Sequence, residues 1–356
     1  MPKTAAASPN DADAAMIDQP TIRVLFLTAL LNVLSEVDDR IDPLLRDYGF
    51  FRSQLDKPYE RVPLHRYVAL LEHAAAKFQR PDLGLEMGQS FGLADLGPFH
   101  ALLRASGTLR GALDCLTLFQ SRLQSKTSFD SQIGPDRTTY SYRIEDPRIW
   151  PRQQDAEFAL SGYANLVRQL TSAKWSPAEV HLEHPITGRD AFLSRFFRAP
   201  VLGNQVANAL IIRNEDLDKP LVSVLSPEDE KLKSVLERHL LDLMGPAAAP
   251  GGGLVALTKD IIARRLGRAR VDCALAAAEL KLSERSLRRR LMEEGTSFRA
   301  LLQEARQERA RLILAAADLP LSVAAEQLGY SDTATFSRAF KDWTGISPGR
   351  YSKNTR

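Results

Sequence analysis

The stretch VDCALAAAELKLSERSLRRRLMEEGTSF (residues 271–298) has the pattern of two short helices joined by a turn. The apolar face of the first helix is formed by Leu275, Ala276, Ala278 and Leu280. Ser283 stands directly before the second helical run, where its hydroxyl can cap free backbone N–H groups. We therefore expect a helix-turn-helix unit whose second helix starts after Ser283.

The second of these helices has two faces of different character. Leu287 and Leu291 are four residues apart and lie on one side, whereas Arg285 and Arg289 share that spacing on another side. A helix held by its apolar side can present arginines to the major groove, because arginine binds guanine through two hydrogen bonds or contacts phosphate. The alternative for any single arginine is a solvated surface group.

The stretch LPLSVAAEQLGYSDTATFSRAFKDWTGISPGRY (residues 319–351) repeats this design. The apolar face of its first helix is formed by Val323, Ala324, Ala325 and Leu328. Gly329 tolerates the positive φ of a turn, and Ser331 or Asp332 is placed to cap the next helix. The same pattern therefore predicts a second helix-turn-helix unit.

The two units are spaced to read one face of DNA. In the second unit Phe336 and Phe340 pack at i, i+4, and Arg338 points to another side. A connecting helix over roughly residues 297–317 runs about 30 Å at 1.5 Å per residue. This length is close to one turn of B-DNA, about 34 Å, so both units can enter successive segments of the major groove.

These residues resemble the AraC/XylS family of bacterial transcription regulators. The matching segments are SERSLRRRLMEEGTSF (residues 283–298) and AAEQLGYSDTATFSRAFKDWTGISP (residues 324–348), with Arg306 and Ala310 in the connecting helix. The ordered Gly-Tyr, Phe-x-x-x-Phe and Gly-x-x-Pro spacing carries the resemblance. One departure is Lys281, where the family commonly has glycine; a lysine in the left-handed region costs roughly 1 kcal/mol.

The resemblance implies a C-terminal all-α domain with two helix-turn-helix units joined by a long helix. It also implies the side chains that meet DNA, which are Arg285, Ser286, Arg288 and Arg289 in the first unit and Thr333, Ala334, Ser337 and Arg338 in the second. Within this set Arg285, Arg289 and Arg338 match positions that contact bases or phosphates. Arg288 and the neighbouring Arg290 are expected on the DNA backbone or in solvent.

Length and charge fit this organisation. A chain of 356 residues is long enough for two domains with their own cores. Residues 260–356 hold 18 Lys or Arg and 12 Asp or Glu, a net charge of +6. Because the whole chain is +3, residues 1–259 carry −3. The basic excess therefore coincides with the predicted DNA-reading region.

Several other classes of protein are disfavoured by the sequence. Cys115 and Cys273 are the only cysteines, which excludes a disulfide framework or a cysteine-rich metal site. The apolar run at residues 24–34 is too short to span a bilayer, and the start lacks the apolar core of a signal peptide. We expect a cytoplasmic protein with no membrane partner.

The sequence predicts an α+β domain for the N-terminal region. After a tail over residues 1–20 that we expect to be disordered, three amphipathic helices are predicted at about residues 22–36, 43–48 and 63–78. Further helices open after Pro81, after Pro98 and after Thr108, a predicted N-cap.

The period then changes from 3.6 to 2, which predicts a sheet. Two alternating runs flank the turn Gly134-Pro135-Asp136 and predict a β-hairpin. A helix follows over about residues 153–172, and residues 179–182 and 209–213 read as two more strands around a short helix at 190–198. We expect a small four-stranded antiparallel sheet partly covered by helices.

Parts of this domain resemble the effector-binding half of the longer AraC/XylS regulators, the ornithine-utilisation type. The resembling segments are LGPFHALLRASGTLRGALDCL (residues 96–116) and FLSRFFRAPVLGNQVANALIIRNEDLDKPL (residues 192–221). The expected organisation is a tail (1–20), an effector-binding α+β domain (21–225), a helix and flexible linker (226–253) and the DNA-binding domain (254–356). The apolar stripe of the helix at about 227–244 predicts pairing with a second copy or packing on its own domain.

The sequence offers no catalytic or cofactor motif. His181 and His184 lie three residues apart on a predicted strand and so point to opposite faces, which disfavours a metal site. We expect no enzyme activity, no catalytic residues and no cofactor. The residues that we predict for an effector pocket are polar-aromatic and are His100, Arg104, Tyr140, Tyr142, Trp150 and Trp175.

The sequence thus predicts a sequence-specific, DNA-binding transcription regulator controlled by a small-molecule effector. Expected partners are double-stranded DNA at a promoter site, the effector, RNA polymerase and a second copy of the chain. The alternative is a DNA-binding regulator whose N-terminal domain only oligomerises or contacts another protein. A buried core with no cavity around Tyr140 and Tyr142 would favour that alternative.

Overall fold

The computed structural model describes residues 19–35, 38–221, 235–236, 238–240, 254–267, 271–280, 282–316 and 320–355. We refer to residues 19–221 as the N-terminal part and to residues 254–355 as the C-terminal part. The predictions for the tail, for Lys281, for the linker and for most of the helix at 227–244 fall outside the described residues. No helix in the described segments is both long and apolar enough to cross a membrane.

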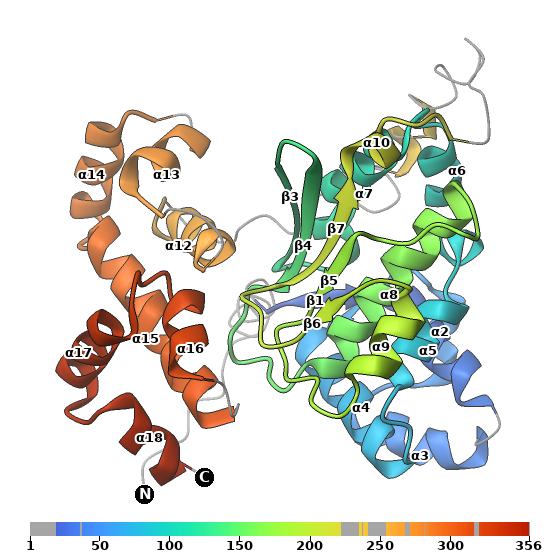
Figure 1. Cartoon of the computed structure of the whole chain (residues 1–356), viewed down its shortest axis with the longest axis horizontal. Helices are drawn as coiled ribbons and strands as arrows, with labels where there is room; N and C mark the ends of the chain where they lie inside the picture. Colours follow the sequence, from blue (N-terminus) through green and yellow to red (C-terminus); the bar gives the residue numbers. More distant parts are fainter. Residues whose placement is uncertain are drawn as a thin grey trace, which may run out of the picture.

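The N-terminal part is built on a five-stranded sheet (Figure 1). Its strands, in spatial order, are β3 (Thr127–Ile133), β4 (Arg137–Ile144), β7 (Asn208–Arg213), β5 (Glu179–His181) and β6 (Val201–Leu202). The prediction of four antiparallel strands is corrected in one respect, because β6 is a fifth strand and runs parallel to β5. A two-residue strand is too short to show the alternation on which the prediction depended.

The predicted hairpin is confirmed. Strands β3 and β4 pair in antiparallel register, with Phe129 opposite Tyr142 and Ser131 opposite Tyr140. At the N-terminus the expectation of one helix from Ile22 is corrected, since Thr21–Arg23 forms strand β1, paired with β2 (Arg61–Pro63). Backbone groups of these residues are engaged by pairing with β2 and by hydrogen bonds between Thr21 and Ser125, and the helix starts only at Leu25.

The other regular elements of the N-terminal part are mainly helices that pack around this sheet. They are α2 (Leu25–Val33), α3 (Asp38–Asp47), α4 (Leu64–Lys77), α5 (Leu83–Ser90), α6 (Phe99–Arg104), α7 (Leu109–Leu123), α8 (Gln153–Leu170), α9 (Asp190–Phe197) and α10 (Asn214–Leu217), with short 3-10 turns at Arg52–Asp56 and Leu93–Leu96. The predicted cap Thr108 accepts a hydrogen bond from the Gly111 amide at 3.1 Å. The result is an α+β architecture, as the sequence predicts.

Helices α5 and α8 approach each other unusually closely. A Cβ atom at Gly88 would lie 1.8 Å from the Ser161 hydroxyl, and one at Gly84 would lie 2.2 Å from the backbone oxygen of Gln154. Only glycine permits this distance between the two helix backbones. The contact fixes the first half of α8, which carries Asp155, one of the polar groups of the cavity described below.

All regular secondary structure among the described residues of the C-terminal part is helical. Its helices are α12 (Leu254–Arg265), α13 (Cys273–Glu279), α14 (Glu284–Glu293), α15 (Phe298–Ala316), α16 (Leu321–Gln327), α17 (Thr333–Thr344) and α18 (Pro348–Thr355). Two separate apolar cores form, one beneath α14 around Leu287 and Leu291 and one beneath α17 around Phe336 and Phe340. The two predicted helix-turn-helix units, α13 with α14 and α16 with α17, are therefore present with the long helix α15 between them.

We call α14 and α17, the second helices of the two units, the recognition helices. They lie on the side of the C-terminal part that faces away from the sheet. In Figure 1, α14 and α17 occupy this outer side, whereas α12 and α16 face the N-terminal part. Helix α15 has 19 residues and therefore spans about 28 Å. The docked arrangement leaves both recognition helices uncovered by the N-terminal part.

Candidate DNA-reading surface and ligand cavity

Helix α14 separates its apolar and cationic faces cleanly. Ser283 caps the helix by accepting a hydrogen bond from the Ser286 amide at 3.1 Å, as predicted. Leu287 and Leu291 are fully buried, which fixes the rotation of the helix about its axis. As a consequence the arginines at 285, 288, 289 and 290 are all exposed, and Ser286 is partly exposed.

The exposed arginines of α14 differ in their neighbours. Arg288 pairs with Glu284, and Arg289 lies 3.7 Å from Glu293. Arg285 forms no ion pair with any described residue. Such surface pairs are weak, typically below about 1 kcal/mol, so a phosphate or a base edge can take the place of the glutamate.

Helix α17 is capped by Asp332 and not by Ser331. The Asp332 carboxylate accepts hydrogen bonds from the amide of Thr335 at 2.7 Å and from its hydroxyl at 2.8 Å. Phe336 and Phe340 are fully buried, so the opposite face points outward. That face carries the remaining predicted contacts, of which Ala334 and Arg338 are exposed and Thr333 and Ser337 partly exposed.

The turn before α17 is held by Arg306 of helix α15. Its guanidinium donates to the carbonyl oxygens of Leu328 at 3.0 Å and Gly329 at 3.1 Å, and it stacks 4.6 Å from the ring of Tyr330. Gly329 has φ of +71°, the left-handed conformation predicted for this turn. The positions of α15 and α17 are therefore coupled. Sequence reasoning noted Arg306 only as a family match.

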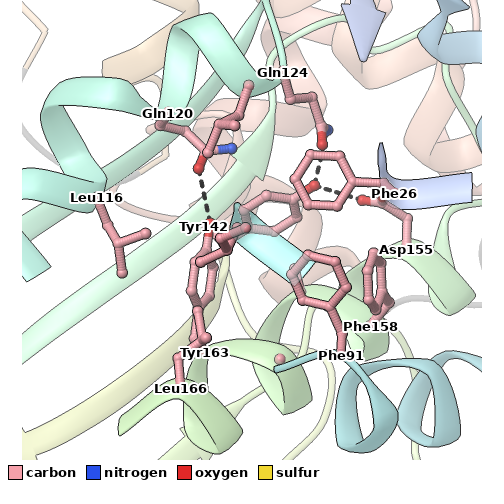
Figure 2. Close-up of a pocket in the computed structure, with 14 residues that line it drawn as sticks. Phe26, Phe91, Leu116, Gln120, Gln124, Tyr142, Asp155, Phe158, Tyr163 and Leu166 are labelled. Atoms are coloured by element: carbon pink, nitrogen blue, oxygen red, sulfur yellow. Dashed lines mark hydrogen bonds between the residues drawn. The ribbon is translucent and has the colours of Figure 1, made fainter. Parts of the chain in front are cut away.

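The N-terminal part contains a cavity between α7, β4 and α8, closed by phenylalanines from α2 and from the segment after α5 (Figure 2). Its volume is about 50 Å³, counted as the space open to the centre of a water molecule. The lining residues are Phe26, Phe91, Leu96, Leu116, Gln120, Leu123, Gln124, Tyr142, Asp155, Phe158, Ala159, Gly162, Tyr163 and Leu166. We call this space the Asp155 cavity.

Two hydrogen-bonded groups supply the polar atoms of the Asp155 cavity. Gln124 donates to the Tyr142 hydroxyl at 2.9 Å, and that hydroxyl donates to Oδ2 of Asp155 at 2.7 Å. On the other side Tyr163 donates to Oε1 of Gln120 at 2.9 Å (Figure 2). Burial raises the pKa of Asp155 to about 7, because the carboxylate is removed from water.

The structure places one of the six predicted effector residues on this cavity. Tyr142 lines it, whereas Tyr140 packs against Phe129 in the core. The other four lie elsewhere: partly exposed His100 and exposed Arg104 on α6, Trp150 in the loop before α8, and Trp175 buried after it. The structure does not bring the six together.

Sequence reasoning did not identify the other polar groups of the cavity. Asp155 lies in the first turn of α8, where an acidic residue is expected for the helix dipole alone. Gln120 and Gln124 lie near the end of the amphipathic helix α7, where glutamine is ordinary. The sequence gives one weak indication of the cavity, because positions on the buried faces of α7 and α8 carry polar residues where apolar residues are usual.

Two hydrogen bonds between described residues connect the N- and C-terminal parts. The buried guanidinium of Arg143, on β4, donates through Nη1 to the carbonyl oxygen of Leu266 at the end of α12. Gln327, at the end of α16, donates to the carbonyl oxygen of Gln205 at 2.9 Å. A cation at a helix C-terminus is favourable because it complements the helix dipole.

Between these bonds lies Arg309 of helix α15. It is 8% exposed, its Nε has no hydrogen-bond partner among the described residues, and burial lowers the pKa of its guanidinium to about 9. It lines two small cavities of about 110 and 20 Å³ that both parts share, with Glu145 and Pro147 in the first and Trp150 in the second. The contact between the two parts is therefore incompletely packed.

The two histidines of the HLEH segment have different partners. His181 contacts Glu179, whereas His184 lies 3.0 Å from the buried Glu157, which also binds Arg189. In the described part of the chain no group of three or more His, Cys, Asp or Glu side chains is arranged to hold a metal ion.

Two family models match the chain. The arabinose-binding N-terminal domain of the AraC transcription regulator matches residues 40–221, and a helix-turn-helix domain matches residues 276–354. The first match covers the sheet and every lining residue of the Asp155 cavity except Phe26, and the second covers both recognition helices.

Individual regulators are also similar to the chain. An uncharacterized HTH-type transcriptional regulator of Mycobacterium tuberculosis, Rv1395, is 51% identical over 283 residues, which cover 76% of this chain and 78% of that protein. The regulator VirS of the same organism is 24% identical over 332 residues, or 93% of this chain and 96% of VirS. The ornithine utilization regulator of Pseudomonas aeruginosa is 24% identical over 330 residues, with the same two coverages.

Proposed function

This chain belongs to the AraC/XylS family of transcription regulators, and from that premise we propose that it reads a specific promoter site under the control of a small molecule bound in the Asp155 cavity. Its DNA-binding activity resides in the helix-turn-helix units. In this proposal α14 and α17 select the DNA sequence, and the N-terminal part determines whether both helices can bind the site at the same time. We also expect a homodimer that contacts RNA polymerase at the promoter.

Specific reading is supported by the geometry of α14 and α17. Each helix is held by two fully buried side chains, so its outward residues have a fixed orientation. Arg285, Arg289 and Arg338 can reach base edges or phosphates from exposed positions. A connecting helix of about 28 Å places the two helices close to one turn of B-DNA apart.

Effector control is supported by one observation above all, the buried carboxyl of Asp155 beside a cavity in the middle of the N-terminal part. Burying an ionisable group costs stability, so its presence there favours a binding role over packing alone. Nine of the fourteen lining residues are apolar. For this reason arabinose, the sugar in the name of the matching family model, is not the effector that we propose.

The cavity and the contact with the C-terminal part share two structural elements. Tyr142 and Arg143 are consecutive on β4, so one side chain faces the cavity and the other faces α12. Asp155 and Arg152 lie one turn apart at the start of α8, and Arg152 lines the smaller shared cavity. A ligand that displaces Tyr142 or Asp155 therefore acts on groups adjacent to the contact.

We propose that the ligand shifts an equilibrium between docked and released C-terminal parts. Such a shift requires unequal affinity of the ligand for the two states. The shared cavities beside Arg309 support a marginal contact, because unpaired buried groups and empty space weaken it.

The experiment has two steps with full-length protein. Genomic fragments are first selected in moderate salt against random competitor DNA, and affinity for the selected site is then measured with and without the low-molecular-mass fraction of a cell extract. We expect a discrete site and a change in affinity on adding the fraction. In Ala159→Phe, which fills the cavity from α8, the site should remain and the change should disappear.

Two results would contradict this proposal. Retention of all fragments with a steep salt dependence would mean backbone binding without sequence reading. A discrete site whose affinity is unaffected by the fraction in both proteins would instead favour an N-terminal part that only oligomerises or contacts another protein.

A further inference from the structure

The polar end of the Asp155 cavity offers a hydrogen-bond acceptor. Oδ2 of Asp155 accepts the Tyr142 hydroxyl, and Oδ1 accepts no hydrogen bond from any described residue. The Tyr142 hydroxyl is itself engaged, because it accepts from Gln124 while it donates to the carboxyl group. Asp155 is only 2% exposed, and its Oδ1 still lacks a hydrogen-bond donor among the described residues.

The cavity carries no positive charge. Its lining contains neither lysine nor arginine nor histidine. The buried guanidinium of Arg152 lies outside the lining and is engaged by Glu183 through two hydrogen bonds of 2.7 and 2.9 Å and by the Ile144 carbonyl oxygen through a third of 2.7 Å, although its charge also favours the ionised form of Asp155. An anion placed here would face the Asp155 carboxyl with no cation in the lining to offset the repulsion, which is costly in a desolvated site.

An aromatic wall lies beside Asp155 (Figure 2). Phe26, Phe91 and Phe158 form a closed triangle with ring centroids 5.5 to 6.1 Å apart. Leu116 of α7 and Leu166 of α8 add apolar groups on the Tyr163 side of the cavity (Figure 2). Apolar groups of a ligand gain free energy by leaving water for such surfaces, whereas polar groups placed against them would lose their hydrogen bonds.

From the Asp155 acceptor and the aromatic wall beside it we infer the chemical class of the effector: an apolar molecule with one hydrogen-bond-donating head, an ammonium or a hydroxyl group, whose head binds Asp155 and whose body packs on the three phenylalanines. Anionic molecules are rejected. This inference rests on the function proposed above, and it deepens that function by naming the ligand class.

The size of the cavity adds one requirement. A space of about 50 Å³ holds a few water molecules, enough for the head group and the first part of the body. A longer body must displace a side chain of the aromatic triangle. Phe26 is the one that lies partly exposed, so its ring can move toward solvent as the ligand enters.

The test uses matched probes that differ only in the head group. One set is phenethylamine, phenethyl alcohol and phenylacetate, and a second is hexylamine, hexanol and hexanoate. Binding of each to the full-length protein is measured by calorimetry and by the shift in melting temperature. We expect the amine or the alcohol of at least one set to bind and both carboxylates to fail.

Variants show whether the head group reaches Asp155. In Asp155→Asn the affinity for the amine should fall about tenfold to a hundredfold, the range expected for loss of a hydrogen bond to a charged group. Tyr140→Phe, on the same strand and outside the cavity lining, is the matched control and should bind every probe as the wild type does. Retained binding of the selected DNA site verifies that each variant is folded.

The two head groups are distinguished by proton release. Because the pKa of Asp155 is about 7, an ammonium head that ionises it at neutral pH releases a fraction of a proton, which calorimetry in buffers of different ionisation heat detects. A hydroxyl head releases none.

The inference is overturned by a carboxylate that binds more tightly than its amine and alcohol, or by the absence of any probe whose binding depends on Asp155. A carboxylate that binds and still shifts DNA affinity would remove the ligand class and leave effector control intact. Failure of effector control itself is recognised separately, by a DNA affinity that no extract fraction changes.

Discussion

The DNA-reading surface and the Asp155 cavity use polar groups in opposite ways. The surface on α14 and α17 places its arginines in water, and each helix orders them by its own periodicity above two buried side chains. The cavity assembles its polar groups from α7, β4 and α8 and keeps Asp155 almost completely buried. The surface is thus specified locally and at little cost to stability, whereas the cavity depends on contacts between distant segments and carries the stability cost of a buried carboxyl group.

This comparison predicts that the core beneath α17 can be broken independently of the exposed arginine. Phe340 is fully buried, with the rings of Phe336 and Tyr351 at 5.8 and 5.3 Å. Phe340→Ala should destabilise the C-terminal part by about 3 to 5 kcal/mol, because it removes a large apolar side chain and leaves a cavity. Hydrogen exchange of the α17 amides in the full chain measures the loss.

DNA binding should fall with the stability of the fold in Phe340→Ala. The control is Phe192→Ala, since Phe192 lies in the N-terminal part and is 42% exposed. A Phe340→Ala protein with unchanged exchange in α17 would mean that this helix does not depend on its buried face, and the explanation of the orientation of Arg338 would be wrong.

The second prediction concerns the stability cost of Asp155. Its folded-state pKa of about 7 lies well above the ordinary value of 3.8, so the folded protein holds this proton more tightly than the unfolded chain. The favourable contribution is complete below about pH 4 and is lost as the pH rises toward 7. Relative to the wild type, Asp155→Asn should therefore gain stability over this interval, by up to about 4 kcal/mol at pH 8.

Urea unfolding of both proteins between pH 4 and 8 measures this difference. Asp136→Asn serves as the control, because it makes the same substitution at a carboxylate that is exposed in the hairpin turn. Parallel curves for wild type and Asp155→Asn would show that the carboxyl is not destabilised by burial. The contrast between an inexpensive surface and a costly cavity would then fail.

The same contrast explains what could be predicted from the sequence. The hairpin follows from alternation over seven and eight residues, and the recognition helices from pairs such as Leu287 with Leu291. Each of these signals is contained within one element. The strand Val201–Leu202 is too short for any periodicity, and its pairing is set by the neighbouring β5.

The cavity could not be predicted in this way, because its residues become neighbours only through the fold. Gln124 and Asp155 are 31 positions apart in the chain and are joined through Tyr142 on a third element. Of the six aromatic and polar residues predicted for the pocket, Tyr142 alone lines it, since side-chain type does not reveal which face of β4 or α8 meets a cavity. The sequence likewise does not distinguish Arg143 from other strand residues, because only the fold brings it to the end of α12.

The smallest effect that we predict sharpens the comparison most, because it separates base reading from charge. Arg289→Ala or Arg338→Ala should weaken binding to the selected site by about 1 to 3 kcal/mol and relax the preference at particular base pairs, if these side chains contact bases. Arg290→Ala is the matched control on α14: it removes the same charge from an exposed position expected on the DNA backbone, so it should weaken specific and random DNA about equally. Competition assays on the selected site, on single-base variants and on random DNA measure both quantities.

Equal losses on all sequences for Arg289→Ala and Arg338→Ala would assign these arginines to phosphates. Sequence selection would then depend on Ser286, Thr333, Ser337 or the shape of the DNA.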